Sequence, residues 1–410
     1  MTEKRPSPTR RALTLTAAAT LALSFVSAVP GAQADPLTGF INVGHRGSSG
    51  LAPENTIAGL ELAAMHQPDV VEVDVQLSAD GQPILFHDTT GARTTNVATV
   101  FPSRASHPIT TFTYAELQQL DAGSWFGPAF AGEKIPLLSD VLDELYPDVG
   151  VVIEIKEPAS SPGIEQVIAD ELAADPRWDD LLDDGLLMAT SFDASSLQTL
   201  RTLHPDIPLG LVGAIPSSNT TLNSIATWAD EMVTNYRLMD PADIARVKAA
   251  GMRFGVYTVN DPDHMANLLS QGVDTIMTDF PKVLEDVQAN VDPLPGANGI
   301  EIVCVNADVP GSDLTANFGE NLALRNNGST TVNVSGYYVR DAVINELVVG
   351  SGYSIPPGGE LRIYTGPGTN ASTRYFNNLG TAVLNNNGDS LALYTSTGEL
   401  IDLYAYRGNW

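Results

Sequence analysis

Five residues with the chemistry of a phosphate site lie at or near the ends of short apolar runs in the first hundred positions. They are His45, Arg46, Glu72, Asp74 and His87. Hydrolysis of a phosphodiester requires positive charge near the phosphate and groups that move protons on the attacking and leaving oxygens. These residue types therefore predict a metal-assisted phosphate site.

Carboxylates on two of the expected strands share one face. Glu72 and Asp74 alternate with valines in one run, and Glu154 and Lys156 repeat this arrangement in another. A carboxylate buried among β-branched residues needs a compensating charge, and oxygen ligands suit Ca²⁺ or Mg²⁺. We expect Glu72, Asp74 and Glu154 to bind one divalent cation. An ion-pair network with Lys156 and Arg46 is the alternative.

These residues lie in a stretch, from residue 40 to about 291, in which β-branched runs alternate with amphipathic segments of helix length. The runs are 41–44, 70–77, 84–87, 151–156, 186–192, 209–212, 232–236, 253–259 and 275–278. The helical segments include 57–66, 164–174, 195–204, 241–250 and 262–271. This alternation predicts an α/β fold, a closed (β/α)₈ TIM barrel, with a doubly wound open sheet as the alternative. Residues 89–134 break the alternation and are expected to form an insertion over one barrel end.

Two of the histidines, His45 and His87, end expected barrel strands. In a parallel barrel His45 and His87 would then lie at the carboxyl-terminal mouth, where active sites are built. An imidazole can serve as base or acid near pH 7, so the two are candidate catalytic residues. The remaining histidines have no acidic cluster beside them in the sequence and are given no role: His66, His107, His204 and His264.

The first 34 residues have the composition of a cleavable signal peptide. Four basic residues precede an apolar stretch from 12 to 29, and Ala32-Gln33-Ala34 offers a cleavage site. The adjacent Arg10 and Arg11 are similar to a twin-arginine signal of bacterial export. Secretion without a stable membrane anchor is therefore expected, the alternative being an anchor that is never removed. Cleavage after Ala34 removes one of 49 acidic and four of 21 basic residues, changing the net charge from −28 to −31, which argues against a nucleic-acid partner.

A second domain is expected after the linker 292–299, which has two prolines, two glycines and no apolar run. The alternating runs 301–305, 321–325, 332–340, 360–364, 390–394 and 400–406 are separated by glycine-containing turns. They predict an antiparallel sandwich over residues 300–410. Cys304, the only cysteine, is expected to be buried and inert in the first of these strands.

Residues 40–290 resemble the glycerophosphodiester phosphodiesterases. The motifs that carry the resemblance occur in the order His45-Arg46-Gly47, Pro53-Glu54-Asn55-Thr56, Glu72-Val73-Asp74-Val75, Asp80-Gly81, His87-Asp88, Glu154-Ile155-Lys156, Tyr257-Thr258-Val259-Asn260 and Thr278-Asp279-Phe280-Pro281. The resemblance implies a (β/α)₈ barrel in residues 35–291, an acid and base pair at His45 and His87, and phosphate binding by Arg46 and Lys156. It implies one divalent cation, Ca²⁺ or Mg²⁺, on Glu72, Asp74 and Glu154.

The same motifs mark four further candidate site residues: Glu54, Asn55, Tyr257 and Asp279. Tyr257 stands where the family often has tryptophan. The expected reaction is hydrolysis of a small glycerophosphodiester to glycerol 3-phosphate and an alcohol. Phospholipase D-like action on a lysophospholipid or sphingolipid, and a non-catalytic binding or adhesion protein, are the alternatives.

Residues 299–406 are similar to lamin-tail domains, which are immunoglobulin-like sandwiches. The resemblance lies in the segments 321–326, 334–341, 355–359 and 387–394, which combine turn glycines with alternating apolar positions. Such domains occur in bacteria attached to secreted enzymes, and the resemblance implies no catalytic role for this one. The sequence does not identify its partner.

Overall fold

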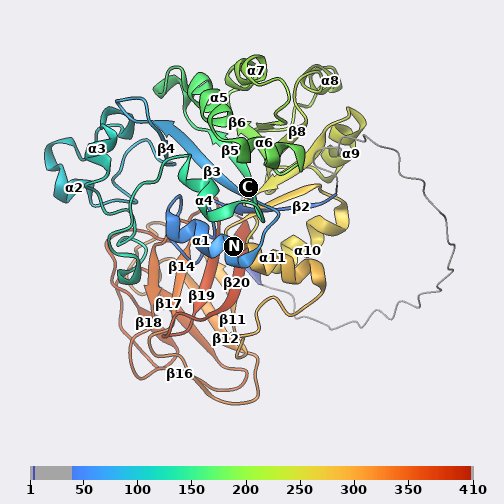
Figure 1. Cartoon of the computed structure of the whole chain (residues 1–410). Coiled ribbons are helices and arrows are strands. Elements are labelled where there is room, and N and C mark those ends of the chain that lie inside the picture. Colours follow the sequence, from blue (N-terminus) through green and yellow to red (C-terminus); the bar gives the residue numbers. More distant parts are fainter. Residues whose placement is uncertain (1–2, 5–38, 408–410) are drawn as a thin grey trace, which may run out of the picture.

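The computed structural model describes residues 3–4 and 39–407 (Figure 1). Apart from Glu3–Lys4, which form the short strand β1, the expected signal peptide at residues 1–34 lies outside the described residues. Within the described part of the chain, every helix is too short or too polar to cross a membrane.

Eight parallel strands close into a barrel. They are β2 (Ile41–His45), β3 (Val70–Leu77), β5 (Gly150–Ile155), β6 (Leu187–Ser191), β7 (Leu209–Val212), β8 (Glu231–Asn235), β9 (Arg253–Tyr257) and β10 (Thr275–Thr278). The last strand, β10, pairs with β2, and β2 pairs with β3, so the sheet has no free edge between its first and last strands. The predicted (β/α)₈ barrel is confirmed, and the open sheet is excluded.

A ninth strand corrects the expected position of His87. The run 84–87 does not form a parallel barrel strand, because β4 (Pro83–Leu85) turns back from β3 and pairs with it antiparallel. The chain in β4 therefore runs opposite to the barrel strands, from above the mouth down toward it, and the Phe86 amide donates to the Asp74 carbonyl at 2.9 Å. His87 reaches the level of Asp74 by descending from above the mouth, not by ending a barrel strand.

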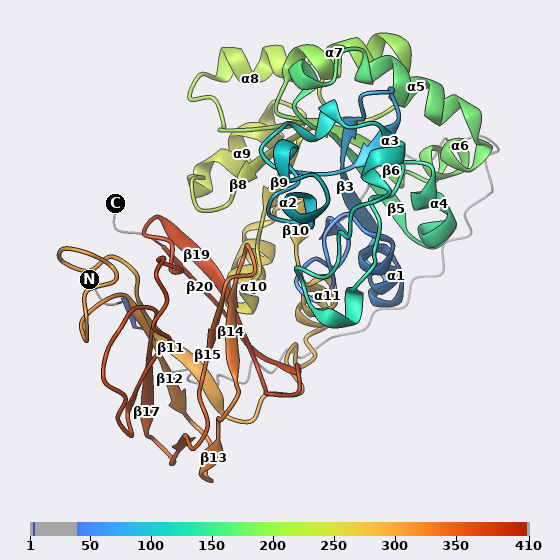
Figure 2. The same ribbon diagram turned by 90° about the vertical axis from the view of Figure 1, so that its left-hand side faces the viewer.

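Helices surround the barrel (Figure 2). They are α1 (Ile57–His66), α4 (Asp140–Leu145), α5 (Ile164–Ala174), α6 (Pro176–Asp183), α7 (Ala194–Leu203), α8 (Asn219–Ile225), α9 (Pro241–Ala249), α10 (Pro262–Gln271) and α11 (Pro281–Ala289). The insertion after β4 contains α2 (Val97–Val100), α3 (Tyr114–Leu117) and its own buried cluster around Phe112.

Side-chain alternation divides each barrel strand between two environments. On β3, Val71, Val73 and Val75 face outward and join the buried cluster under the helices, so Glu72 and Asp74 face the barrel interior. The interior below them is filled by a separate apolar cluster: Ile41, Val43, Val70, Val152, Met188 and Met277. The barrel is thus closed beneath the acidic residues, which are left at its mouth.

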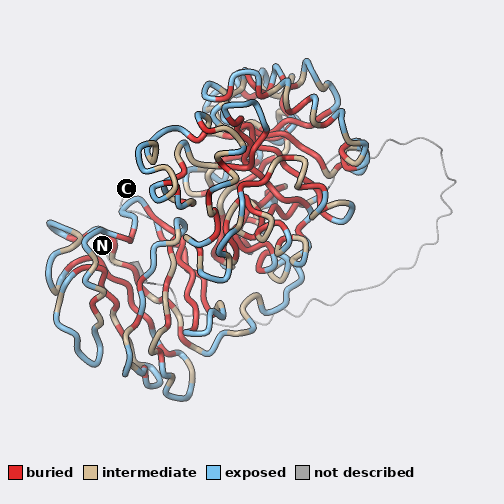
Figure 3. Tube along the Cα trace, turned by 60° about the vertical axis from the view of Figure 1, so that its left-hand side comes forward, coloured by how far each residue is buried: buried red, intermediate tan, exposed pale blue. Residues whose placement is uncertain are grey.

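The carboxyl-terminal part is a β-sandwich, as predicted (Figure 3). One sheet contains β1, β11 (Ile300–Asn306), β12 (Asn321–Asn326), β17 (Glu360–Tyr364) and β18 (Arg374–Phe376). The other contains β15 (Glu346–Val348), β14 (Tyr338–Asp341), β19 (Gly388–Tyr394) and β20 (Leu400–Arg407). Cys304 is buried in β11, as expected.

The single strand expected at 332–340 is wrong. The run is broken into β13 (Val332–Asn333), which pairs with β16 (Ser354–Ile355), and β14. Between them Gly336 has a φ of 78°, a conformation that favours glycine and turns the chain from one strand into the other. Alternation of apolar residues continues through this turn, so the sequence pattern does not reveal it.

The sandwich packs directly against the barrel. Ala392, Tyr394 and Leu403 of β19 and β20 belong to the same buried apolar cluster as barrel residues such as Phe254 and Phe280. Figure 2 shows the sheet with β14, β19 and β20 on the side of the sandwich that faces the barrel. The two parts therefore share a continuous apolar core across their junction.

Candidate active site

Strand register brings the three predicted metal-binding acids together. Glu72 on β3 lies opposite His45 on β2, and Asp74 lies opposite Glu154 on β5. Each of the three offers a carboxylate oxygen, and these oxygens lie within 4.8 Å of one another. All three side chains are buried, so the mouth of the barrel holds a compact set of hard oxygen ligands.

The basic residues that the structure describes around this cluster pair with only two of its three carboxylates. Lys156 Nζ lies 2.8 Å from Glu154 Oε1 and 3.3 Å from Asp74 Oδ1, while Arg46 Nε lies 3.2 Å from Asp74 Oδ2. Glu72 accepts a hydrogen bond from the Arg46 amide at 3.0 Å, but its buried Oε1 has no hydrogen-bond partner among the described residues. The ion-pair alternative thus accounts for Asp74 and Glu154 and leaves Glu72 without a countercharge. The donor set fits Ca²⁺ or Mg²⁺.

The pKa values of the three acids divide differently, because those of Glu72 and Glu154 are raised by burial and by neighbouring carboxylates whereas that of Asp74 is lowered. Burial raises the pKa of Glu72 well above its usual range, and the charges of Asp74 and Glu154 raise it further. Burial opposes ionisation of Asp74 too, but Arg46, His87 and Lys156 together hold its pKa below the usual range. A cation bound among the three acids would favour the ionised form of Glu72 and so oppose this rise in its pKa.

Arg46 is aimed at the cluster by an unusual backbone. Its φ is 53°, in the left-handed region, and the following Gly47 has a φ of 96°. A Cβ at Gly47 would lie 2.6 Å from the Gly59 carbonyl oxygen of α1, so only glycine allows this close approach. The tight loop directs the Arg46 amide to Glu72 and its guanidinium to Asp74 and to Glu54 Oε1, at 2.9 Å.

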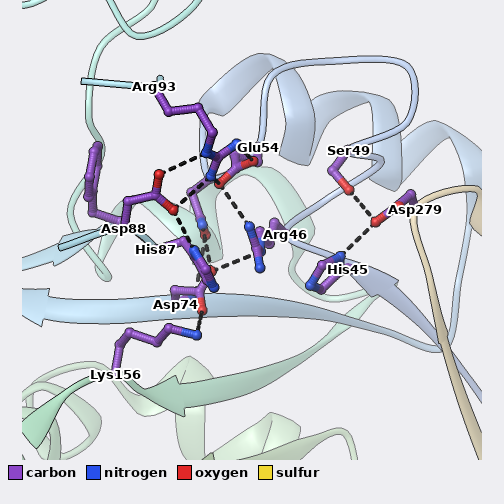
Figure 4. A network of polar contacts seen from close by, with 12 residues as sticks. His45, Arg46, Ser49, Glu54, Asp74, His87, Asp88, Arg93, Lys156 and Asp279 are labelled. Atoms are coloured by element: carbon purple, nitrogen blue, oxygen red, sulfur yellow. Dashed lines mark hydrogen bonds and ion pairs between the residues drawn. The ribbon is translucent and has the colours of Figure 1, made fainter. Parts of the chain in front are cut away.

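Each candidate catalytic histidine is held at Nδ1 by a carboxylate (Figure 4). His45 Nδ1 lies 2.6 Å from Asp279 Oδ1, and His87 Nδ1 lies 2.7 Å from Asp88 Oδ1. Burial opposes ionisation of Asp279, but hydrogen bonds from His45, Asn260 and Ser49 hold its pKa below the usual range. Because an ionised carboxylate only accepts, each histidine donates from Nδ1 and leaves Nε2 free for chemistry.

An arginine from the insertion ties two parts of the site together. Arg93 donates to Asp88 from Nε and Nη2, at 2.7 and 2.9 Å, and to Glu54 from Nη1 and Nη2, at 2.8 and 2.7 Å. Glu54 in turn accepts from Arg46, and Asp88 holds His87. The pKa of Glu54 stays below its usual range despite burial because both arginines surround it.

The other predicted site residues take supporting places. Asn55 donates to Asp74 Oδ2 at 2.9 Å and accepts from the Asp74 amide, which fixes that carboxylate. Tyr257 packs edge-on against Phe192, with the ring centroids 6.2 Å apart, and Phe192, a residue 55% exposed, lies under Lys156. The tyrosine and the phenylalanine thus form an aromatic rim beside the lysine.

Part of this set surrounds one cavity of about 320 Å³, lined by His45, His87, Arg46, Glu54, Tyr257 and Asp279 together with Arg93 and Trp125 of the insertion. The three acids and Lys156 are not among its lining residues and adjoin it through Arg46. The structure therefore brings both histidines and the phosphate-binding candidate Arg46 to the same space. Arg93, Trp125, Ser49 and Asn260 were not among the predicted site residues. Asp88 had been recognised only as part of the His87-Asp88 motif.

Comparison with known proteins identifies relatives for both parts of the chain. Residues 45–283 match the model of the glycerophosphoryl diester phosphodiesterase family, and residues 295–408 match that of the Lamin Tail Domain. A glycerophosphodiester phosphodiesterase of Bacillus subtilis is 30% identical over 260 residues, which cover 60% of this chain and 86% of the relative.

Solved structures give the same result. A phosphodiesterase of Oleispira antarctica, solved in complex with the product sn-glycerol-3-phosphate, superposes with a TM-score of 0.51 at 32% identity. The match covers 60% of this chain and 96% of that one. A glycerophosphodiester phosphodiesterase of Agrobacterium tumefaciens superposes with a TM-score of 0.50 at 28% identity, covering 62% and 100% of the two chains.

Proposed function

Since this chain belongs to the glycerophosphoryl diester phosphodiesterase family and is thus a phosphoric diester hydrolase, we propose that it cleaves glycerophosphodiesters with two histidines and one divalent cation. The products are glycerol 3-phosphate and an alcohol. The observation that carries this proposal is the shared cavity, in which two carboxylate-bound histidines face the same space as an arginine beside a three-carboxylate cluster.

The histidines are proposed to move the protons. With Nδ1 committed to Asp279 or Asp88, each imidazole presents Nε2 to the cavity. One deprotonates the nucleophile, and the other protonates the leaving alkoxide as the bond from phosphorus to oxygen breaks. The paired carboxylates stabilise the imidazolium that forms on the histidine acting as base.

Positive charge is proposed to come from three sources. Glu72, Asp74 and Glu154 hold Ca²⁺ or Mg²⁺, which would supply Lewis-acid polarisation of the phosphoryl oxygens. Arg46 and Lys156, both within 3.3 Å of Asp74, bind the phosphate. Arg46 presents a planar guanidinium suited to two phosphate oxygens, and Lys156 adds a point charge.

The substrate half that the barrel holds is proposed to be glycerol 3-phosphate. The Oleispira antarctica relative was solved with that product bound. A match to 60% of this chain covers 96% of that relative. A site formed by barrel residues therefore suffices for the glycerol 3-phosphate half, and the alcohol half extends toward the rest of the cavity.

We also propose that the enzyme is secreted after cleavage at Ala34. Export would be tested by sequencing the amino terminus of the protein in the medium, where Asp35 should be the first residue.

The central experiment measures glycerol 3-phosphate released from glycerophosphoethanolamine, with and without a chelator. Full activity should require added Ca²⁺ or Mg²⁺, and His45→Ala or His87→Ala should each lower the rate by about 10²–10⁴-fold. Wild-type rates in either histidine variant would overturn the assignment of that residue.

Cation binding is tested separately by titrating chelator-treated protein with Ca²⁺ and Mg²⁺. Glu72→Gln should weaken binding, because it replaces one anionic ligand of the cluster. Glu61→Gln, an exposed change on α1, is the matched control and should bind like the unaltered protein. Equal affinity in the two variants would remove Glu72 from the set of ligands.

A further inference from the structure

A tight turn of the sandwich is rigidly built next to the cavity. The turn 342–345 joins β14 to β15, and Asp341 accepts hydrogen bonds from the Val343 amide at 3.0 Å and from the Asn345 amide and side chain, both at 2.7 Å. The Ile344 amide bonds the Asp341 carbonyl at 3.1 Å. One buried carboxylate thus fixes the whole turn.

The residue at the tip is unexpected for such a turn. Ile344 has a φ of 67°, a conformation that glycine or asparagine adopts readily and a β-branched residue rarely does. Its neighbour Val343 is 51% exposed. The turn therefore carries two branched apolar side chains at a place where backbone geometry and solvent exposure both favour other residues.

Both side chains border the active-site cavity. Val343, Ile344, Ser390 and Leu391 of the sandwich line the same space as His45 and His87 of the barrel. The catalytic groups form one side of this space, and the turn with strand β19 forms another. The sandwich thus completes the cavity. The two solved relatives are covered over 96% and 100% of their length by only 60% and 62% of this chain.

Buried bonds fix the sandwich in this position. Tyr394 Oη donates to the Gly50 carbonyl at 2.8 Å, in the loop that follows His45, and the Ala405 amide donates to Asp261 Oδ2 at 3.0 Å. Arg340, at the end of β14, donates to the Phe126 carbonyl at 3.1 Å and lies 4.9 Å from the Phe126 ring. The turn is therefore held at the barrel mouth from both sides.

We propose that the sandwich is part of the active site, and that Val343 and Ile344 form the wall that selects the leaving alcohol. This inference rests on the proposed function, in which barrel residues hold the glycerol 3-phosphate half. The alcohol half then faces the remaining lining, which the turn and β19 supply. The presence of an isoleucine in this strained conformation is explained if the site requires its side chain.

The wall favours small alcohols. The cavity of about 320 Å³ lies at the low end of the ~300–1,000 Å³ typical of ligand sites, and it must also accommodate glycerol 3-phosphate. The enzyme is thus expected to prefer a diester of a small alcohol such as ethanolamine over one of a bulky alcohol such as inositol.

The test compares kcat/KM for glycerophosphoethanolamine and glycerophosphoinositol in the full-length enzyme. Ile344→Asn keeps a residue that tolerates the backbone and removes the branched side chain, and Val343→Ser shortens the other. Each should shift the ratio toward the inositol diester by about tenfold, the usual range for added space in an apolar pocket. Val343→Trp should shift it in the opposite direction.

The matched control is Val348→Ser, which changes another partly exposed valine, in β15, that is not among the residues lining the cavity. Its ratio should equal that of the unaltered enzyme. An unchanged ratio in Ile344→Asn and Val343→Ser, with melting temperatures maintained, would overturn the wall. Failure of the proposed function would differ, because the unaltered enzyme would then release no glycerol 3-phosphate from either diester. In that case the dissociation constants of the two diesters would be measured by calorimetry. A ratio that shifts in Ile344→Asn and Val343→Ser would support the wall, and an unchanged ratio would overturn it.

Discussion

Replacing Asp279 by asparagine tests how the barrel orients His45. Asp279 Oδ1 accepts hydrogen bonds from His45 Nδ1 at 2.6 Å and from Ser49 Oγ at 2.8 Å, and its Oδ2 accepts from Asn260. An asparagine has only one oxygen, so it cannot serve both sides. If the asparagine NH₂ group faces Asn260, two donors oppose each other. If it faces His45 instead, Nδ1 must accept its hydrogen bond, and the imidazole proton moves to Nε2.

The first outcome keeps the tautomer but removes the negative charge that stabilises the imidazolium and breaks the bond to Asn260, and the second outcome gives the imidazole the wrong tautomer. A hydrogen bond to a charged group contributes about 1.5–3 kcal/mol. Because ~1.4 kcal/mol corresponds to a tenfold change in rate, Asp279→Asn should lower kcat/KM by roughly 10- to 100-fold. The rate is measured as glycerol 3-phosphate released from glycerophosphoethanolamine at saturating Ca²⁺ or Mg²⁺.

Ser49→Ala provides the matched comparison, because it removes one neutral hydrogen bond to the same carboxylate oxygen and leaves the charge in place. A neutral bond contributes about 0.5–1.5 kcal/mol, so this variant should lose no more than about tenfold. Melting temperatures of both variants establish that the fold is kept. If folded Asp279→Asn retained more than half of the wild-type kcat/KM, the reasoning that Asp279 orients His45 would be refuted.

Two further predictions concern charges that sequence reasoning did not assign. Arg93→Lys should lower kcat/KM about as much as Arg93→Met, roughly tenfold or more, because a lysine cannot reproduce the paired bonds to Asp88 and Glu54; a lysine variant with normal kinetics would count against this role. Burial, and then the charge of Asp341, raise the pKa of Asp389 to about 7, so the fold binds its proton more tightly than the unfolded chain does. Its contribution to stability is present below about pH 4 and is lost as the pH rises through 7, by up to roughly 4 kcal/mol. Asp389→Asn should therefore raise the melting temperature at pH 8 and change it little at pH 4, and an equal effect at both pH values would contradict the raised pKa.

The barrel could be predicted because its determinants are local. Alternating valines and acids on β3 fix which side chains face inward, and pairing with β2 and β5 places Glu72 beside His45 and Asp74 beside Glu154. The alternating pattern of these strands thus predicted both the fold and the position of the acidic cluster. Closure itself required the structure, since periodicity is the same in open and closed parallel sheets.

What the sequence could not predict depends on contacts between distant segments. Strand direction does not change an alternating pattern, so β4 was expected to run parallel and His87 was placed at the mouth for the wrong reason. Arg93 lies in the irregular insertion, where no periodicity assigns a direction to a side chain. The contribution of the sandwich to the cavity depends on bonds such as that of Tyr394 to Gly50, 344 residues apart in the chain.

That separation has a consequence for how the enzyme matures. Ribosomes add about 5–20 residues per second, so roughly 6–24 seconds pass between completion of the last barrel helix and completion of β20. During this interval a nascent barrel can already hold both histidines, Arg46, Lys156 and the three-carboxylate cluster. Its choice of alcohol, by contrast, would be set only when strands from the far end of the chain reach the loop after β2. A nascent chain could thus acquire catalytic competence before it acquires selectivity.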